Sequence, residues 1–274
     1  MAKLNDYAAV TRFDSNGILM TDGSSGTRKI TANNAAIDLA GRVSSEQHRS
    51  IYGGRNLGST VTDAHKTAIS SGTFDNLYIG DYWTINGIHW IIADMDYFYN
   101  CGDSRLTKHH LVIIPAGILY SYKMNTSNTT EGGYVNSLMY TEGLNQAKES
   151  FALAFPNLVL THRDFLINAV TQGRPSGAAW FDSTVELMSE IHVYGTHFYH
   201  PMNTGDTIPA LASTATRQFS LFRLNSSSMN IGTYYWLRDV VSATRFARFD
   251  GSGRALSDIA SLLVGVRPYA VIGL

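Results

Sequence analysis

The sequence has a single cysteine, Cys101, among 274 residues, so no disulfide can form within the chain. Core packing therefore has to hold the fold, and a lone cysteine is typical of a protein that folds in a reducing cytosol. Charged residues make up only 16% of the chain, with 21 Lys and Arg against 22 Asp and Glu. This balance lacks the positive excess that phosphate binding requires, so we expect no nucleic-acid partner.

Long apolar runs are also missing. No stretch approaches the ~18 uncharged apolar residues of a membrane-spanning helix, and the start of the chain has no apolar signal-peptide core. We therefore expect no membrane insertion, and a protein that works outside the cell would leave by lysis or inside a particle. Tyr, Asn, Ser, Thr and Gly are abundant instead, which suits loop-rich surfaces and favours recognition over metabolism.

The common catalytic motifs are absent. The chain has no Gly-x-Ser-x-Gly, no phosphate-binding loop, no Rossmann glycine pattern and no His-Glu-x-x-His. Each of these chemistries needs its groups at a fixed spacing. We therefore predict a protein that is not an enzyme, with no catalytic residue and no cofactor.

Two groups of residues could still supply metal or acid–base chemistry. His197 stands in a His-x-x-His pattern with His200, and His192 is nearby, but cysteines are missing and aromatic neighbours favour structural histidines, so we predict no metal ligand. Asp94 and Asp96 have strand spacing, and paired carboxylates can serve acid–base catalysis or bind calcium. We interpret them as polar residues on the wet face and edge of an antiparallel sheet.

The first segment, residues 1–50, is predicted to be an arm. Turn signals at residues 15–17 and 22–23 flank a short apolar run at residues 18–20, which indicates a hairpin. An Ala-rich stretch at residues 34–40 predicts a brief helix. This segment has too little apolar material to fold alone, so we expect it to dock on a partner or on its own oligomer mates.

Residues 51–274 are predicted to form one domain. Residues 60–63 can cap a short helix that extends to Ile69. Asn86-Gly87 lies between two β-rich runs and is the strongest hairpin signal in the chain. The apolar run at residues 110–115 indicates a strand that is covered on both faces.

Helices are expected in the middle of the chain. Residues 131–155 contain an amphipathic segment, residues 161–173 predict another helix that Gly173 ends, and Ser183 and Glu186 form the pattern of a capping box. Short strands are expected to follow Pro201. The sequence thus predicts an α+β fold of antiparallel strands and packed helices.

A loop near the C-terminus carries the candidate ligand-binding residues. It combines small hydrogen-bonding side chains with rigid aromatic ones, which is typical of recognition loops, and it equally fits a surface loop that enters an aromatic-rich strand. Two arginines in the next hairpin could bind carboxylates or acidic sugars, although a solvated face explains them equally well. The aspartate that follows them resembles the start of a calcium loop but lacks the downstream oxygen ligands, so a glycine-rich turn is the better interpretation. The candidates are Asn225, Ser227, Asn230, Tyr234, Tyr235, Arg245, Arg248 and Asp250.

The end of the chain resembles a known terminal motif. Trp236-Leu237-Arg238 and Gly265-Val266-Arg267-Pro268 are similar to paired strands in C-type-lectin-like domains related to formylglycine-generating enzymes. The resemblance implies a C-type-lectin-like domain over residues 51–274 in which the guanidinium groups bind loop carbonyls or carboxylates, while the loop between the strands contacts ligand. Its structural residues would be Trp236, Arg238, Gly265, Arg267 and Pro268. Cys101 alone cannot form the copper site of those enzymes, so oxidase activity is not implied.

A second resemblance extends over residues 51–274. Segments such as IYGGRNLGSTVTDAH and GTFDNLYIGDYWTINGIHWIIADMDY are similar to structural proteins of Firmicutes phages and prophages, and residues 4–30 resemble phage attachment segments. This implies a non-catalytic virion protein made in the bacterial cytoplasm, either a head fibre or a capsid decoration. Its expected partners are other capsid or tail proteins, bound through the arm, and a host surface glycan or protein. A homo-oligomer is expected, with a trimer as the first guess. A tail receptor-binding protein and a retroelement-diversified adhesin remain alternatives.

Overall fold

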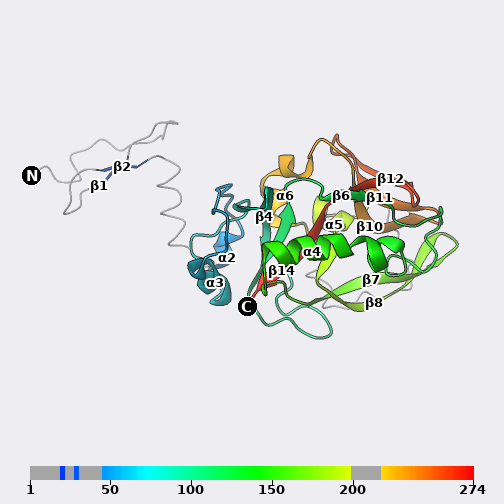
Figure 1. Ribbon diagram of the computed structural model, residues 1–274, viewed down its shortest axis with the longest axis horizontal. Helices are drawn as coiled ribbons and strands as arrows, with labels where there is room; N and C mark the ends of the chain where they lie inside the picture. The colour runs from blue at the N-terminus through cyan, green and yellow to red at the C-terminus, as the bar shows by residue number, and fades with distance from the viewer. Residues whose placement is uncertain (1–18, 22–27, 31–44, 199–216) are drawn as a thin grey trace, which may run out of the picture. The chain divides into compact units, whose positions relative to one another are not determined.

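The computed structural model describes residues 19–21, 28–30, 45–198 and 217–274 (Figure 1). The chain divides into two compact units, residues 1–44 and residues 45–274. The sequence predicts this boundary at residue 50.

The described part of the first unit is a short hairpin. Strand β1 (Leu19–Thr21) pairs antiparallel with β2 (Arg28–Ile30), and Leu19 lies opposite Ile30. The predicted hairpin is therefore confirmed. The helix predicted at residues 34–40 lies outside the described residues.

The second unit is built mainly from two five-stranded sheets. The first sheet is antiparallel and has the strand order β3 (Tyr82–Ile85), β4 (Ile88–Met95), β5 (His110–Pro115), β14 (Pro268–Gly273) and β9 (Val185–Leu187). The second has the order β12 (Ala255–Ile259), β11 (Arg245–Phe249), β10 (Tyr235–Ser242), β13 (Val264–Val266) and β6 (Tyr120–Tyr122). In the second sheet β10 and β13 run parallel, and the chain then passes from β13 directly into β14 of the first sheet.

Helices are few and short. The described ones are α2 (Ser45–His48), α3 (Asp63–Ser70), the π-helix η2 (Met139–Gly143), α4 (Asn145–Ala154), α5 (Glu190–Tyr194), α6 (Ser220–Leu224) and the 3-10 helix η4 (Ser226–Met229). Together with the sheets they form an α+β fold, which is the fold class that the sequence predicts. Strands predominate in it. Within the described residues no helix is long and apolar enough to cross a membrane.

Helix α4 packs on the first sheet through aromatic side chains. Trp90 of β4 lies 4.6 Å from Phe151 of α4 and 5.6 Å from Phe155, the residue that follows α4, measured between ring centroids, and all three are fully buried. Buried aromatic rings remove large apolar areas from water, so this contact anchors the helix to the sheet.

Three local predictions are confirmed. Thr62 caps α3, since its Oγ1 accepts from the His65 backbone N–H at 3.3 Å while His65 Nδ1 accepts from the Thr62 N–H at 3.2 Å. Asn86 and Gly87 have φ of 53° and 75°, the left-handed values that a two-residue hairpin turn between β3 and β4 requires. Every residue of β5 is buried.

The helix predicted at residues 161–173 is wrong. This segment is β7 (His162–Thr171), which pairs antiparallel with β8 (Arg174–Ser183). Gln172 and Gly173 form the connecting turn with φ of 52° and 75°. Gly173 therefore ends a strand rather than a helix, because pairing across the hairpin outweighs the helical pattern of the isolated segment.

The capping box predicted at Ser183 and Glu186 is also wrong. Ser183 ends β8 and Glu186 lies in β9, and the two side chains meet in a buried hydrogen bond of 2.9 Å. The capping box of this region is formed instead by Ser189 and His192, at the start of α5. The helix expected within residues 131–155 forms only over its second half, as α4 preceded by η2.

Candidate functional site

A buried ion pair lies at the centre of the terminal motif. Arg238 of β10 donates from Nη2 to Asp164 Oδ1 at 3.2 Å and from Nη1 to the Tyr269 hydroxyl at 3.3 Å. Asp164 Oδ2 also accepts from Tyr269 at 2.5 Å and contacts His162 Nε2 at 3.1 Å. Burial by itself would raise the pKa of Asp164, but the Arg238 charge and these hydrogen bonds hold that pKa well below its usual range.

Glu186 is a second buried carboxyl group near this ion pair. Its Oε2 accepts from the Tyr134 hydroxyl at 2.8 Å and its Oε1 accepts from the Ser183 hydroxyl at 2.9 Å. Burial, together with the negative charge of Asp164, raises the pKa of Glu186 to about 7. The second carboxyl group therefore takes up a proton near neutral pH.

Arg267, the other arginine of the motif, binds backbone carbonyls. Its guanidinium is buried and donates from Nε to the Pro115 carbonyl at 3.1 Å. Nη2 donates to the Ser228 carbonyl at 3.1 Å and Nη1 to the Met229 carbonyl at 3.4 Å. The side chain thus ties η4, which carries candidate ligand residues, to strand β5.

The remaining motif residues hold the strands together. Trp236 is fully buried and its Nε1 donates to a backbone carbonyl of β6 at 2.9 Å. Gly265 has no space for a side chain, because a Cβ there would lie 2.5 Å from the Tyr234 carbonyl oxygen and would overlap Ile118. Pro268 is the first residue of β14 and pairs with β9. The two arginines thus contact a carboxylate and backbone carbonyls, although the carbonyls belong to β5 and η4 rather than to loops.

Two of the candidate loops meet beside an exposed aromatic ring. A Cβ on Gly251, in the turn after β11, would lie 3.4 Å from the backbone carbon of Gly232 in the turn before β10. Next to this contact Tyr234 is 51% exposed, and the Arg248 guanidinium lies 4.2 Å from its ring centroid. Asp258 of β12 fixes Arg248 by accepting from Nε at 3.0 Å. The two loops therefore present an exposed aromatic ring with a guanidinium group stacked on it.

The other loop candidates occupy different environments. Asn225, Ser227 and Asn230 lie on η4 and at its two ends, and Ser227 and Asn230 are exposed. The Ser227 hydroxyl donates to Asn225 Oδ1 at 2.5 Å, and Asn230 Oδ1 accepts from the Gly232 N–H at 2.9 Å. Arg245 is exposed at the opposite end of β11 from these loops.

Tyr235 and Asp250, two further candidates, are buried. The Tyr235 ring stacks on Phe249 at 4.8 Å and its hydroxyl donates to the Met229 carbonyl at 3.2 Å. Asp250 accepts hydrogen bonds from the backbone N–H groups of Ser252 and Arg254 and from both of their side chains. Both residues shape the loops from inside.

The wet-face interpretation of Asp94 is wrong. A bulge between Ile92 and Asp94 interrupts the pairing of β4 with β5, and the Asp94 carboxylate is fully buried. It accepts from the Ser220 N–H at 2.9 Å and from Arg217 Nη2 at 3.2 Å. Asp96 is only partly buried and contacts His109 Nδ1 at 2.7 Å, so the two carboxylates have separate partners.

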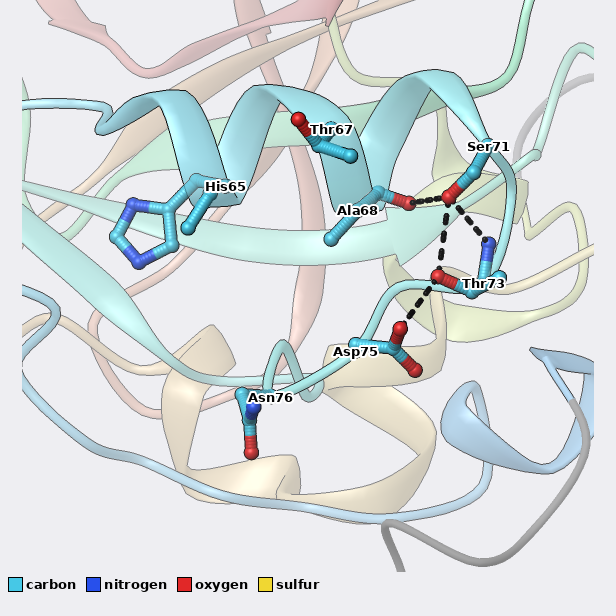
Figure 2. Close-up of a pocket in the computed structure, with 8 residues that line it drawn as sticks. His65, Thr67, Ala68, Ser71, Thr73, Asp75 and Asn76 are labelled. Carbon is cyan, nitrogen blue, oxygen red and sulfur yellow. Dashed lines mark hydrogen bonds between the residues drawn. The ribbon is translucent and has the colours of Figure 1, made fainter.

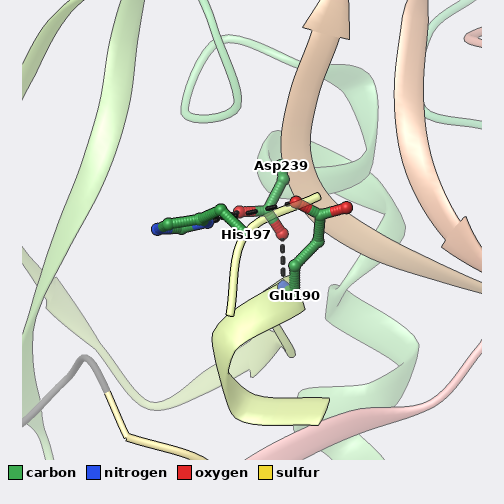
Figure 3. Close-up of side chains that lie close together, drawn as sticks. All are labelled: Glu190, His197 and Asp239. Carbon is green, nitrogen blue, oxygen red and sulfur yellow. Dashed lines mark hydrogen bonds and ion pairs between the residues drawn. The ribbon is translucent and has the colours of Figure 1, made fainter. Parts of the chain in front are cut away.

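One cluster of metal-ligating side chains emerges from the described residues, and Figure 3 shows it. Glu190, His197 and Asp239 each direct one ligand atom to within 4.8 Å of the others. His192 belongs to a different environment, because its Nδ1 accepts from the Ser189 N–H and its ring stacks on Phe219. His200 lies outside the described residues.

The His-x-x-His pattern raises His197 as a possible metal ligand, but the sequence led us to predict no metal ligand and gives no sign of the two acids of this cluster. Asp239 is 49 positions from Glu190, and nothing in local spacing connects a residue in β10 with the first turn of α5. Only the packing of α5 beside β10 brings the two together.

A surface pocket of about 480 Å³ lies elsewhere, along α3 and the turn that follows it (Figure 2). Its polar groups bond to one another: Ser71 Oγ lies 3.0 Å from Thr73 Oγ1, which donates to Asp75 Oδ2 at 3.0 Å. The candidate ligand residues of the C-terminal loops do not line it.

Comparisons with protein-family models, curated proteins and solved structures give no match for this chain. The fold and the site therefore define the class only broadly, as an α+β protein with a buried Arg–Asp ion pair and with a second buried arginine that binds carbonyls of β5 and η4.

Proposed function

We propose that this chain is a non-catalytic virion structural protein of a bacteriophage, a head fibre or capsid decoration with a C-type-lectin-like domain over residues 51–274. The N-terminal arm attaches it to other virion proteins, and it assembles as a homo-oligomer, with a trimer as the first expectation. The C-terminal loops bind a glycan or protein on the host surface. The ordered sequence segments that resemble phage structural proteins support the virion role.

The observation that carries the binding role is the stacked pair of Tyr234 and Arg248 where two loops meet. An exposed tyrosine offers a large contact area with few rotatable bonds, so little conformational entropy is lost when it binds. A neighbouring guanidinium adds donors that suit carboxylates or hydroxyl groups. This combination fits a glycan or a polar protein surface.

The loops are also prepared for binding by the core beneath them. Arg267 donates to the Ser228 and Met229 carbonyls and the Tyr235 hydroxyl also donates to the Met229 carbonyl, so the chain before Tyr234 is fixed at two adjacent carbonyls. A loop that is already ordered pays less entropy on association than a mobile one. The buried residues thus support an exposed contact surface.

A cell-binding experiment tests the proposal. Purified, labelled full-length protein should bind host bacteria saturably, and Tyr234→Ala should weaken that binding at least tenfold. Tyr52→Ala is the matched control, because Tyr52 is 45% exposed and lies outside the C-terminal loops. Equal binding by wild type and Tyr234→Ala would contradict the role of the loops.

A particle measurement distinguishes decoration from adhesion. A decoration protein should raise the melting temperature of the capsid when it is added to particles that lack it. A rise in capsid melting temperature without any cell binding would assign the chain to decoration alone.

A further inference from the structure

The cluster of Glu190, His197 and Asp239 brings together three parts of the second unit. Glu190 is the first residue of α5, Asp239 lies in β10, and His197 follows the end of α5 (Figure 3). Asp239 Oδ2 accepts from the Glu190 backbone N–H at 2.6 Å, which leaves Oδ1 3.8 Å from His197 Nδ1. Glu190 Oε2 accepts from the Phe198 N–H at 3.0 Å and lies 4.0 Å from the same His197 atom.

The three side chains of this cluster offer two carboxylates and one imidazole. Glu190 and Asp239 are both buried, and two carboxylates in close proximity repel each other strongly where water is excluded. His197 faces both of them and, when protonated, supplies one positive charge against two negative ones. A divalent cation would balance both carboxylates and leave the imidazole neutral as a nitrogen ligand.

We propose that Glu190, His197 and Asp239 bind one divalent transition-metal ion of the Zn²⁺ class. One imidazole nitrogen with two carboxylate oxygens is a donor set that zinc accepts, with three protein ligands and one position left for water. Calcium takes six to eight oxygen ligands, so a nitrogen-containing set of three groups does not suit it.

The spacing of the ligand atoms agrees with an ion of this size. Zinc–ligand bonds of about 2.0–2.2 Å place the ligands of a tetrahedral ion roughly 3.3–3.6 Å apart. The observed separations of 3.8 and 4.0 Å exceed this by a few tenths of an ångström. His197 is partly exposed, so its side chain can move to shorten these two distances when an ion binds.

The site goes beyond the proposed binding function, because none of its residues belongs to the C-terminal loops. The ion would tie the segment after α5 to β10, one residue from Arg238 of the buried Arg238–Asp164 ion pair. Its role is therefore to stabilise the fold, and its test does not depend on any host ligand.

The experiment measures Zn²⁺ binding to full-length protein after dialysis against a chelator. Isothermal titration calorimetry should give one Zn²⁺ per chain. At a free Zn²⁺ concentration about 100 times the Kd, the melting temperature should rise by about 5 to 10 °C. Ca²⁺ under the same conditions should give no such rise.

Two variants locate the ion. Asp239→Asn removes one charged ligand, while its amide oxygen still accepts from the Glu190 N–H, and His197→Ala removes the nitrogen ligand at a partly exposed position. Each should weaken Zn²⁺ binding at least tenfold and abolish the visible d–d absorption of bound Co²⁺. His89→Ala, an exposed histidine of β4, is the matched control and should bind as the wild type does.

Two results would overturn the proposal. One is a wild-type protein that neither binds Zn²⁺ nor gains thermal stability from it. The other is unchanged Zn²⁺ affinity in His197→Ala, which would place any bound ion at a different site. If Asp239→Asn does not fold, His197→Ala decides the matter alone.

Discussion

The guanidinium of Arg248 lies over the ring of Tyr234, with its central carbon 4.2 Å from the ring centroid. Arg248 is itself held by Asp258 on the neighbouring strand, so an exposed ring is supported by an ion pair of the sheet. This links the position of the exposed Tyr234 ring to the packing of β11 and β12.

Replacing Arg248 by Met should weaken cell binding without unfolding the protein. Cation–π contacts at exposed sites contribute about 0.5–1 kcal/mol, which corresponds to roughly a two- to fivefold loss of affinity. Titration of host cells with labelled Arg248→Met measures this directly. Unchanged affinity would show that Arg248 does not order Tyr234 for binding.

The neighbouring tyrosines should respond differently to truncation. Tyr235→Ala leaves a cavity against Phe249 and should lower the free energy of unfolding by about 3–5 kcal/mol. Tyr234→Ala removes an exposed ring and should change it by less than about 1 kcal/mol. Urea denaturation of the two variants compares them, and similar losses would contradict the burial of Tyr235.

Breaking the buried ion pair should be costly. Arg238→Met leaves the Asp164 charge buried without its guanidinium partner and should reduce the free energy of unfolding by about 3–5 kcal/mol. Adding Asp164→Asn should recover part of the loss, because the uncompensated charge is then removed. A double-mutant cycle by guanidinium denaturation checks this, and additive losses would argue against a coupled pair.

Glu186 should make stability depend on pH. Burial raises its folded-state pKa to about 7, so its contribution is fully present below the unfolded pKa near 4.3 and is lost as pH rises through 7. Glu186→Gln should remove this dependence, which amounts to about 4 kcal/mol over that range.

A buried histidine works in the opposite direction. Burial lowers the pKa of His110 to about 4, so its contribution is present above pH 6.5 and is lost as pH falls through 4. Urea denaturation between pH 4.5 and 8 should therefore show a steeper acid loss in Glu186→Gln than in wild type. Parallel profiles would contradict the raised pKa of Glu186.

Local signals predicted the parts of the fold that local chemistry controls. The turn at Asn86-Gly87 follows from the left-handed φ that both residues tolerate, and Thr62 caps α3 through its own side chain. The apolar run at residues 110–115 indicated a covered strand, and every residue of β5 is buried. In the terminal motif, the resemblance implied partners of the type that Arg238 and Arg267 contact.

Features that depend on distant packing could not be predicted in this way. Residues 161–173 carry a helical pattern, yet they pair with β8. Tyr234 and Tyr235 are adjacent in sequence, and only the position of Phe249 shows which of them is buried. The acids around His197 come together through the packing of α5 on β10, which no sequence spacing reveals.

The virion role is tested most directly by imaging purified phage particles with gold-labelled antibody against this chain. The proposal predicts label on the particle, and its position on capsid or tail distinguishes a decoration or head fibre from a tail protein. Unlabelled particles, with the protein free in the lysate, would contradict the virion role and favour a cellular binding protein.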